Sequence, residues 1–222
     1  MRVAALYDVH GNLPALEAVL AEVTAAGVDA IVCGGDVAAG PFPRECLERL
    51  RDRDAVFVRG NADRELSPWL LARLTDAEQQ FLAQLPHVRS LGGVLYCHGS
   101  PRRDDEILTR ITPQERLAAV LEGIEETLVV CGHTHVQFDL RVGAARIVNA
   151  GSVGMPYEGR QGAFWALVDA DGVEHRHTAY ALDAAIVAIR ATEYPGADDL
   201  CSTLLDPEDP DEVSAYFESL AA

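Results

Sequence analysis

The sequence predicts an α/β domain built on a largely parallel sheet. Short apolar runs that suit buried strands alternate with amphipathic helical segments over the first 131 residues. The chain has 222 residues, 49% of them hydrophobic, which is enough for one sizeable core. Because no internal repeat, low-complexity segment or linker interrupts the sequence, we expect a single domain over residues 1–222.

The first helix carries the clearest local signals. Apolar residues recur with a period of 3.6 between positions 13 and 26, Pro14 lies in the first turn, and Gly27 follows the end. Apolar runs before and after this helix, and again after a second short helix, predict three buried strands. The elements expected in this part are a strand at 3–7, a helix at 13–26, a strand at 30–33, a helix at 43–51 and a strand at 55–58.

Residues 64–90 are expected to be helical and to lie near the functional site, because this segment joins two strand ends. Thr75 and Glu78 form a capping box within it. Thr112 and Glu115 form a second capping box, which predicts a helix that ends at about residue 122. The strands on either side of this second helix are expected at 93–97 and 128–131.

The pattern changes after residue 135. Short strand candidates with close turn signals, such as Asp171-Gly172, suggest an antiparallel meander. His175 and His177 lie on one face of a further strand, which we interpret as a solvated face. Residues 178–222 are expected to form an acidic helical C-terminal cap. The strand candidates are 136–140, 145–148 and 164–169, and the helices are 181–192 and 209–220.

Charge and composition exclude several classes of function. The net charge of −17 disfavours duplex nucleic acid and anionic membrane surfaces as partners. All 18 basic residues are Arg, which removes Schiff-base chemistry, PLP attachment and P-loop phosphate binding. An anionic substrate is still compatible with this charge, because bound metal cations can reverse the local potential.

The cysteines and the first residues bear on the compartment of the protein. The cysteines form no CxxC pair, and we expect them to be reduced and buried. No apolar run approaches the ~20 residues needed to span a bilayer, and the start of the chain lacks the pattern of a signal peptide. A cytoplasmic protein is therefore expected by default. The cysteines are Cys33, Cys46, Cys97, Cys131 and Cys201.

Five of the predicted strands end in side chains that can bind a ligand. In open parallel sheets, ligands bind beyond the carboxyl ends of the strands, so these side chains are expected to meet. A single His after a strand is more often structural, but seven such residues at five strand ends are hard to reach by chance. The residues are Asp8, His10, Asp36, Asn61, His98, His133 and His135.

This set of side chains predicts a metal centre. Three carboxylate or amide oxygens and four imidazoles are too many ligands for one tetrahedral zinc ion. They suit two five- or six-coordinate ions that share a carboxylate, with Mn²⁺ preferred and Fe, Zn²⁺, Ni²⁺ or Mg²⁺ as alternatives. Two ions about 3.5–4 Å apart form the arrangement used for in-line displacement at phosphorus.

The same residues, in order and with their spacing, resemble the signature of calcineurin-like metallophosphoesterases, in particular a small bacterial phosphodiesterase-type branch. The resemblance spans about residues 1–170. It implies a four-layer αββα sandwich of two mixed β-sheets with flanking helices, and a dimetal site at the carboxyl ends of the strands. The matching motifs are Asp8-Val9-His10, Gly35-Asp36, Gly60-Asn61, His98, Gly132-His133-Thr134-His135 and the turn at 149–154.

The resemblance also implies a role for each position. A hydroxide that bridges the two metals attacks phosphorus, and the expected catalytic residues are Asn61, Asp63 and His98. Asn12 and Arg64 are expected to contact the substrate. The implied ligands are Asp8, His10, Asp36 and His135 for the first metal, and Asp36, Asn61, His98 and His133 for the second, with Asp36 bridging.

Position 62 departs from the pattern of many family members. They carry a His directly after the Gly-Asn, where it can protonate the leaving oxygen, whereas this chain has Ala62 followed by Asp63. General acid catalysis is worth ~10²–10⁴-fold, so the poor leaving groups of monoesters should suffer most from its loss. We therefore expect phosphodiesters or phosphoanhydrides of small molecules or nucleotides as substrates. Arg102 and Arg103 are either further phosphate contacts or solvated surface side chains.

Two other interpretations stay open. The first is a protein or small-molecule phosphomonoesterase that uses another proton donor. The second is a non-catalytic scaffold on the same fold, as in the retromer subunit of this family, although the complete ligand set disfavours it. The natural substrate, the metals bound in the cell and the oligomeric state are not fixed by the sequence.

Overall fold

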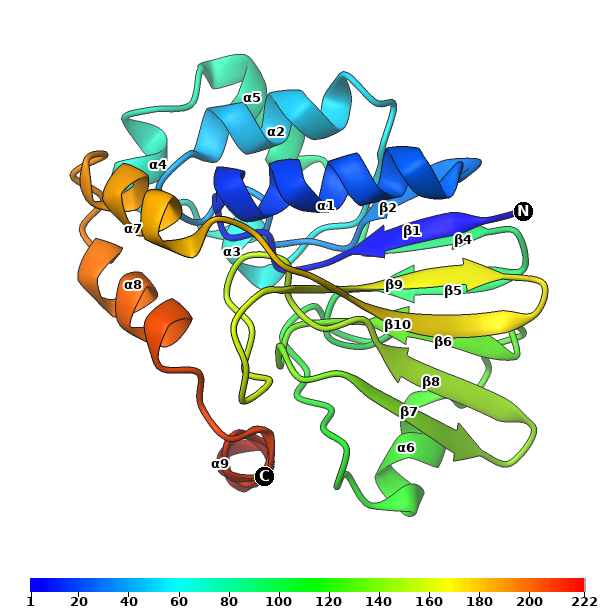
Figure 1. Ribbon diagram of the computed structural model, residues 1–222. Coiled ribbons are helices and arrows are strands. Elements are labelled where there is room, and N and C mark those ends of the chain that lie inside the picture. The colour runs from blue at the N-terminus through cyan, green and yellow to red at the C-terminus, as the bar shows by residue number, and fades with distance from the viewer. Residues whose placement is uncertain (222) are drawn as a thin grey trace.

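The protein is described by a computed structural model that covers residues 1–221. Within these residues, two five-stranded mixed sheets pack face to face, and helices cover the outer side of each sheet (Figure 1). The arrangement is the four-layer αββα sandwich expected from the sequence. The carboxyl ends of the parallel strands in both sheets point to the same side of the molecule, where the loops of the functional site lie.

The first sheet has the strand order β10-β9-β1-β2-β3. The three strands nearest the N-terminus run parallel, whereas β9 is antiparallel to both β1 and β10. Both faces of β1 are buried, because Ala4 and Leu6 face the helices and Val3 and Ala5 face the other sheet. The strands are β1 (Val3–Leu6), β2 (Ala30–Cys33), β3 (Val56–Phe57), β9 (Ala163–Asp169) and β10 (Gly172–Thr178).

The second sheet has the order β4-β5-β6-β8-β7. Its three central strands run parallel, and an antiparallel strand closes each edge. Between the two sheets lies a thin apolar layer in which the Tyr7 hydroxyl donates to the Val130 carbonyl at 2.8 Å. The strands are β4 (Val88–Leu91), β5 (Val94–Cys97), β6 (Leu128–Cys131), β7 (Phe138–Val142) and β8 (Ala145–Asn149).

The helices divide between the two outer layers and the C-terminal segment (Figure 1). The first and longest helix begins as expected, with Pro14 in its first turn, and ends at Gly27, whose φ of 62° is left-handed. The helices are α1 (Leu13–Ala26), α2 (Pro43–Arg51), α3 (Asn61–Arg64), α4 (Pro68–Leu71), α5 (Asp76–Ala83), α6 (Gln114–Val120), α7 (Leu182–Arg190), α8 (Ala197–Leu205) and α9 (Pro210–Leu220).

Two expectations for the middle of the chain were wrong. Residues 64–90 are not helical to their end, because residues 88–91 form an edge strand that folds back on β5 through Gly92 and Gly93, both with positive φ. The capping box expected at Thr112 does not form. Its hydroxyl instead donates to Glu218 of α9 at 2.8 Å, and α6 begins after Pro113 without a side-chain cap. The capping box at Thr75 does form.

The meander expected after residue 135 is split between the two sheets. Strands β7 and β8 form a hairpin in the second sheet, and β9 and β10 form a hairpin in the first. Strand β8 also pairs with β6 in parallel. The alternation of polar and apolar residues predicts each hairpin, but it does not say which sheet a hairpin joins.

The C-terminal segment is more than the solvated cap expected from its acidity. No helix was expected at α8, which packs against α7 through a cluster that includes Ile189, Leu200 and Leu204. The five cysteines are all buried and free, and His175 and His177 lie exposed on β10, as predicted. Among the helices of residues 1–221, none has the length and apolar character that crossing a bilayer requires.

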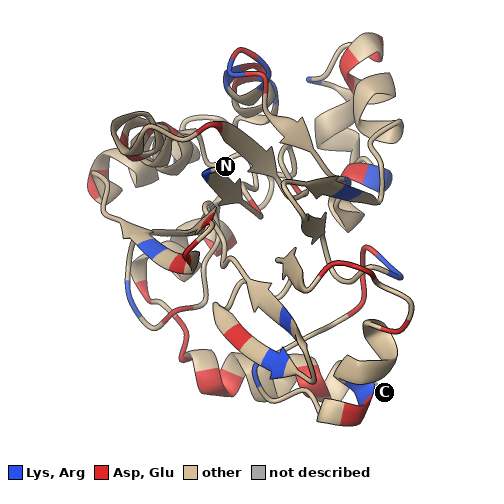
Figure 2. Cartoon of the chain, turned by 90° about the vertical axis from the view of Figure 1, so that its right-hand side faces the viewer, with Lys and Arg blue, Asp and Glu red and all other residues tan. Residues whose placement is uncertain are grey.

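Basic and acidic positions are interspersed along the chain in the view of Figure 2. Arg146 of β8 and Asp139 of β7 form an ion pair, with the Arg146 Nε 2.7 Å from the Asp139 Oδ1. Arg102 and Arg103 also pair on the surface, with Glu106 and Asp105 respectively. Exposed pairs of this kind contribute about 0–1 kcal/mol each.

Candidate metal centre

The seven predicted ligands lie at the carboxyl ends of β1, β2, β3, β5 and β6. Five of them have a left-handed backbone, with φ between 46° and 68°. Only seven non-glycine residues within residues 1–221 have a positive φ, so this conformation is concentrated at the site. Such residues cost of order 1–3 kcal/mol each and cluster at functional sites. The five are Asp8, His10, Asp36, His133 and His135.

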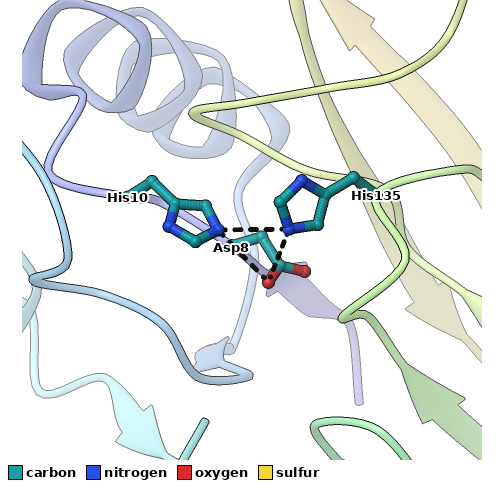
Figure 3. A group of neighbouring side chains, drawn as sticks. All are labelled: Asp8, His10 and His135. Carbon is teal, nitrogen blue, oxygen red and sulfur yellow. Dashed lines mark hydrogen bonds and ion pairs between the residues drawn. The ribbon is translucent and has the colours of Figure 1, made fainter. Parts of the chain in front are cut away.

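The first group consists of Asp8, His10 and His135, whose side chains converge from two loops of different sheets (Figure 3). The Asp8 Oδ1 lies 3.2 Å from the His135 Nε2 and 3.7 Å from the His10 Nε2. The two Nε2 atoms are 3.1 Å apart. A carboxylate oxygen and two imidazole nitrogens at this spacing form a donor set typical of first-row divalent ions.

The second group consists of Asp8, Asp36 and His98, all of them buried. The His98 Nε2 lies 3.5 Å from the Asp36 Oδ2 and 3.7 Å from the Asp8 Oδ1. The Asp36 Oδ2 also lies 3.9 Å from the His10 Nε2. Both carboxylates therefore face both groups, so either one could lie between two bound ions.

The donor atoms fit divalent cations. Asp8 is fully buried, and its Oδ1 has no hydrogen-bond partner within the described part of the chain. A buried carboxylate oxygen that accepts no hydrogen bond is costly unless a cation lies beside it. This oxygen belongs to both groups, which is the position that a ligand to bound metal would take.

Backbone carbonyls fix the orientation of two imidazoles. The His98 Nδ1 donates to the Gly34 carbonyl at 2.9 Å, and the His135 Nδ1 donates to the Met155 carbonyl at 2.7 Å. With Nδ1 held as the donor to a carbonyl, Nε2 is the ring nitrogen of each histidine that faces the carboxylates, where a metal ion would bind. Such hydrogen bonds set the tautomer and the direction of metal-binding histidines.

Backbone amides fix the carboxylates. The Asp36 Oδ1 accepts from the Ala62 amide at 2.8 Å, and the Asp8 Oδ2 accepts from the His133 amide at 2.9 Å. Asp63 is buried, and its Oδ2 accepts from the amides of Asp36 and Gly60 at 2.8 and 2.9 Å. Asp63 therefore holds the turn that carries Asp36, and its expected catalytic role stays a prediction.

Two glycines of the motifs allow these close approaches. A Cβ on Gly60 would lie 2.1 Å from the Asp36 Oδ1 and 2.4 Å from the Asp36 nitrogen. A Cβ on Gly132 would lie 2.5 Å from both the Asp8 Oδ2 and a ring carbon of Tyr7. Because carbon cannot approach so closely, these positions require glycine whatever their backbone angles.

The electrostatics of the site demand positive charge between the carboxylates. Burial by itself lowers the pKa of His98, but Asp36 and Asp8 outweigh burial and raise that pKa to about 10. Burial raises the pKa of Asp36, yet His98 and His10 outweigh it and hold that pKa well below its usual range. Burial and the neighbouring charge of Asp36 raise the pKa of Asp63 to about 7. Divalent cations would add to the positive charge that the imidazoles supply here.

The remaining predicted residues lie at the margin of the two groups. The Asn61 Oδ1 lies 3.1 Å from the His98 Nε2. The His133 ring meets the His98 ring edge to face, with 5.2 Å between centroids, and burial followed by the charge of His98 lowers its pKa to about 4. Both side chains adjoin the second group, so their assignment as ligands stays a prediction that the geometry permits.

The two predicted substrate contacts have protein partners. Asn12 is fully buried, caps α1 by accepting from the Ala15 amide, and donates to the Gly154 carbonyl at 2.9 Å. The Arg64 guanidinium donates to Asp104 at 2.8 Å. These contacts are structural, and the contact of either side chain with substrate stays a prediction.

Sequence reasoning missed the residues of the loop after β8 that support the site. Tyr157 stacks on His135, with ring centroids 5.1 Å apart and planes inclined by 15°. Met155 contributes the carbonyl that orients the same imidazole. Their positions are 20 or more residues beyond the motif, and neither side chain belongs to a ligand type, so no local pattern indicated them.

Comparison with known proteins identifies the family. The model of the calcineurin-like phosphoesterase superfamily domain matches residues 1–172. The crystal structure of a metallophosphoesterase from Sphaerobacter thermophilus superposes with a TM-score of 0.81 and 30% identity, covering 93% of this chain and 99% of that one.

Two curated relatives match most of both chains. An uncharacterized protein of Methanocaldococcus jannaschii is 27% identical over 203 residues, covering 75% of this chain and 82% of that protein. The phosphodiesterase YfcE of Escherichia coli is 29% identical over 176 residues, covering 74% of this chain and 85% of that protein. Because the family model matches most of the chain, the chain belongs to the calcineurin-like phosphoesterase superfamily. This family depends on two metal ions, and the protein is a phosphoester hydrolase.

Proposed function

We propose that this protein is a dimetal phosphodiesterase, with Mn²⁺ as the preferred ion, that acts on small phosphorylated molecules or nucleotides. The observation that carries the proposal is the pair of overlapping groups of metal-binding side chains around the Asp8 Oδ1, which accepts no hydrogen bond, next to a methyl side chain at position 62. The first feature provides for two cations. The second removes the side chain that would best assist a poor leaving group.

Each donor group would hold one ion. The first ion would be held by Asp8, His10, Asp36 and His135, and the second by Asp36, Asn61, His98 and His133, with Asp36 shared between them. Bound divalent ions activate a water molecule and neutralise charge on the phosphate oxygens. Oxygen and imidazole ligands without thiolate suit Mn²⁺, Fe or Zn²⁺.

The chain's own residues orient the reacting groups. The amides of Ala62 and His133 keep the two carboxylates fixed, so the charge that the phosphate meets is preorganised. The Asn61 side chain lies at the margin of the second group, where its amide can donate to a phosphate oxygen. Position 62 offers no titratable group, so a leaving oxygen must depart without a proton from this position.

This chemistry favours esters with a good leaving group. A monoester that releases an alkoxide needs an acid, which is typically worth ~10²–10⁴-fold. The relative named as a phosphodiesterase supports the preference for diesters. A phosphomonoesterase is the second candidate, and it requires a proton donor outside the motif positions.

The test compares bis(4-nitrophenyl) phosphate with 4-nitrophenyl phosphate, using purified protein loaded with Mn²⁺. We expect kcat/KM for the diester to exceed that for the monoester at least tenfold. Equal or greater monoesterase activity contradicts the proposal. Metal analysis of the same sample tests the non-catalytic alternative, because a scaffold that binds no metal would retain none after gel filtration.

A further inference from the structure

A cavity of about 270 Å³ opens beside the first donor group. His10 forms part of its wall, so a ligand in the cavity lies next to a proposed metal ligand. The opposite walls come from the loop after β8 and from the C-terminal segment around α8, which lie together at the site end of the sheets (Figure 1). The cavity is lined mainly by His10, Met155, Tyr157, Tyr194, Asp199 and Thr203.

Two aromatic side chains border this cavity, and both are held in place. Tyr157 is fixed by its parallel contact with His135. Tyr194 packs edge-on against Trp69, with 5.5 Å between ring centroids, and the Trp69 indole nitrogen donates to the Gly40 carbonyl at 3.0 Å. Aromatic side chains held in this way form stacking surfaces for planar rings without losing much conformational entropy on binding.

The polar groups of the cavity complement a ring rather than a second phosphate. Asp199 provides an acceptor and Thr203 provides a hydroxyl, which suit the N–H and carbonyl groups on the edge of a heterocycle. The Asp199 carboxylate repels an anion. A volume of about 270 Å³ is below the ≈ 300–1,000 Å³ typical of pockets for drug-sized ligands, so it suits one ring system.

We infer that this cavity binds the non-reacting ester group of the substrate, and that this group carries a planar, nucleobase-like ring. The inference rests on the phosphodiesterase function proposed above and specifies its substrate class. The predicted metal ligands all lie within the family match, which ends at residue 172. Tyr194, Asp199 and Thr203 of the cavity lie in the chain beyond it. The C-terminal segment therefore determines specificity without providing a metal ligand.

The test compares two diesters with the same leaving group, thymidine 5′-(4-nitrophenyl) phosphate and methyl 4-nitrophenyl phosphate. We expect the Mn²⁺-loaded protein to have a kcat/KM at least tenfold higher for the thymidine ester. Tyr194→Leu, which keeps an apolar side chain against Trp69, should lower kcat/KM about tenfold for the thymidine ester and leave the methyl ester unchanged. Tyr194→Phe should keep the preference. Tyr216→Leu is the matched control: it makes the same change at an exposed tyrosine of α9 that does not line the cavity, and it should alter neither rate.

The outcomes separate this inference from the proposed function. If both diesters are hydrolysed equally well and Tyr194→Leu changes neither rate, the inference is overturned and the phosphodiesterase function stands. If neither diester is hydrolysed, the proposed function fails, and calorimetric binding of thymidine 5′-monophosphate and deoxyribose 5-phosphate decides the inference separately. Tighter binding of the nucleotide that Tyr194→Leu abolishes supports the cavity as a base site, and equal affinities contradict it.

Discussion

The two sheets contribute different chemistry to one site. The loops of the first sheet supply every carboxylate of the predicted set and its single amide, whereas the loops of the second sheet supply three of the four imidazoles. One member of each set is held in place by the other sheet. The His98 ring from the second sheet donates to the Gly34 carbonyl of the first, and the Asp8 carboxylate of the first accepts from the His133 amide of the second.

This difference shows that neither half of the sandwich contains a complete site. Carboxylates on one sheet alone would repel one another, and imidazoles on the other would lack their anionic partners. The site therefore depends on how closely the two sheets pack at their carboxyl ends. Substitutions that remove a shared ligand, or that separate the two sheets, should have the largest effects.

Asp36→Asn should cause the greatest loss of activity, because it removes the negative charge of a carboxylate that faces both groups of metal-binding side chains. We expect kcat/KM to fall by at least about 10³-fold, since metal-ion stabilisation of the transition state is worth several kcal/mol. The measurement is Mn²⁺-dependent hydrolysis of bis(4-nitrophenyl) phosphate, together with the metal content of the purified variant. Full activity with two bound ions would remove Asp36 from the ligand set.

Gly132→Ala tests the contact between the sheets without removing any ligand. Its Cβ would meet the Asp8 carboxylate and the Tyr7 ring, so we expect a loss of about 1–3 kcal/mol in unfolding free energy and about 10²-fold in kcat/KM. Denaturant unfolding and kinetics measure the two effects. Gly123→Ala is the comparison, because its Cβ would face open space: any loss of stability there comes from its positive φ of 78° and not from a contact, and kcat/KM should be unchanged. Unchanged kinetics in Gly132→Ala would show that the sheets tolerate separation.

Ala62→His adds an imidazole to the loop of the first sheet at the position where other family members carry one. We expect the ratio of the 4-nitrophenyl phosphate rate to the diester rate to rise about tenfold. This is less than the full ~10²–10⁴-fold effect of general acid catalysis, because the added imidazole has no evolved surroundings to orient it. A new limb in the pH–rate profile of the variant should accompany this rise. An unchanged ratio would mean that position 62 does not set the preference between diesters and monoesters.

Asp139→Asn should have the smallest effect, because Asp139 and Arg146 form their pair on the partly exposed edge of the second sheet, away from the site. Arg146 lowers the pKa of Asp139, so the pair stabilises the fold above the usual carboxyl pKa of 3.8 and loses this contribution as the pH falls through the lowered value. At pH 7 we expect a cost of no more than about 1 kcal/mol in urea unfolding and an unchanged kcat/KM. A cost that persists at the lowest pH would contradict the electrostatic origin.

The elements of the first 58 residues could be predicted because their signals are local. The helix at residues 13–26 has its period, its Pro14 and its terminal Gly27 within one stretch, and the structure places it there. The hairpins after residue 135 were also indicated by alternation and turns. Their sheets were not, since a strand's partner is chosen by packing against residues far away in the sequence.

The C-terminal segment shows the limit of composition as a guide. Its acidity suggested a solvated cap, yet Leu200 and Leu204 bury one side of α8 against α7. Only three-dimensional packing brings Tyr194 and Asp199 beside His10, more than 180 residues earlier in the chain. The hydroxyl of Thr112 is a similar case, because its partner Glu218 lies 106 residues away and replaces the local cap.

The sequence by itself determined which side chains could bind metal, because ligand type and position after a strand are written in adjacent residues such as Gly132-His133-Thr134-His135. It also determined the absence of an acid at Ala62. The tertiary structure decided how those side chains combine: Asp8 belongs to both groups, Tyr157 supports His135, and the C-terminal segment forms a wall beside His10. These relations depend on distances between the two sheets and the C-terminal helices, which are set by packing and not by neighbours in the sequence.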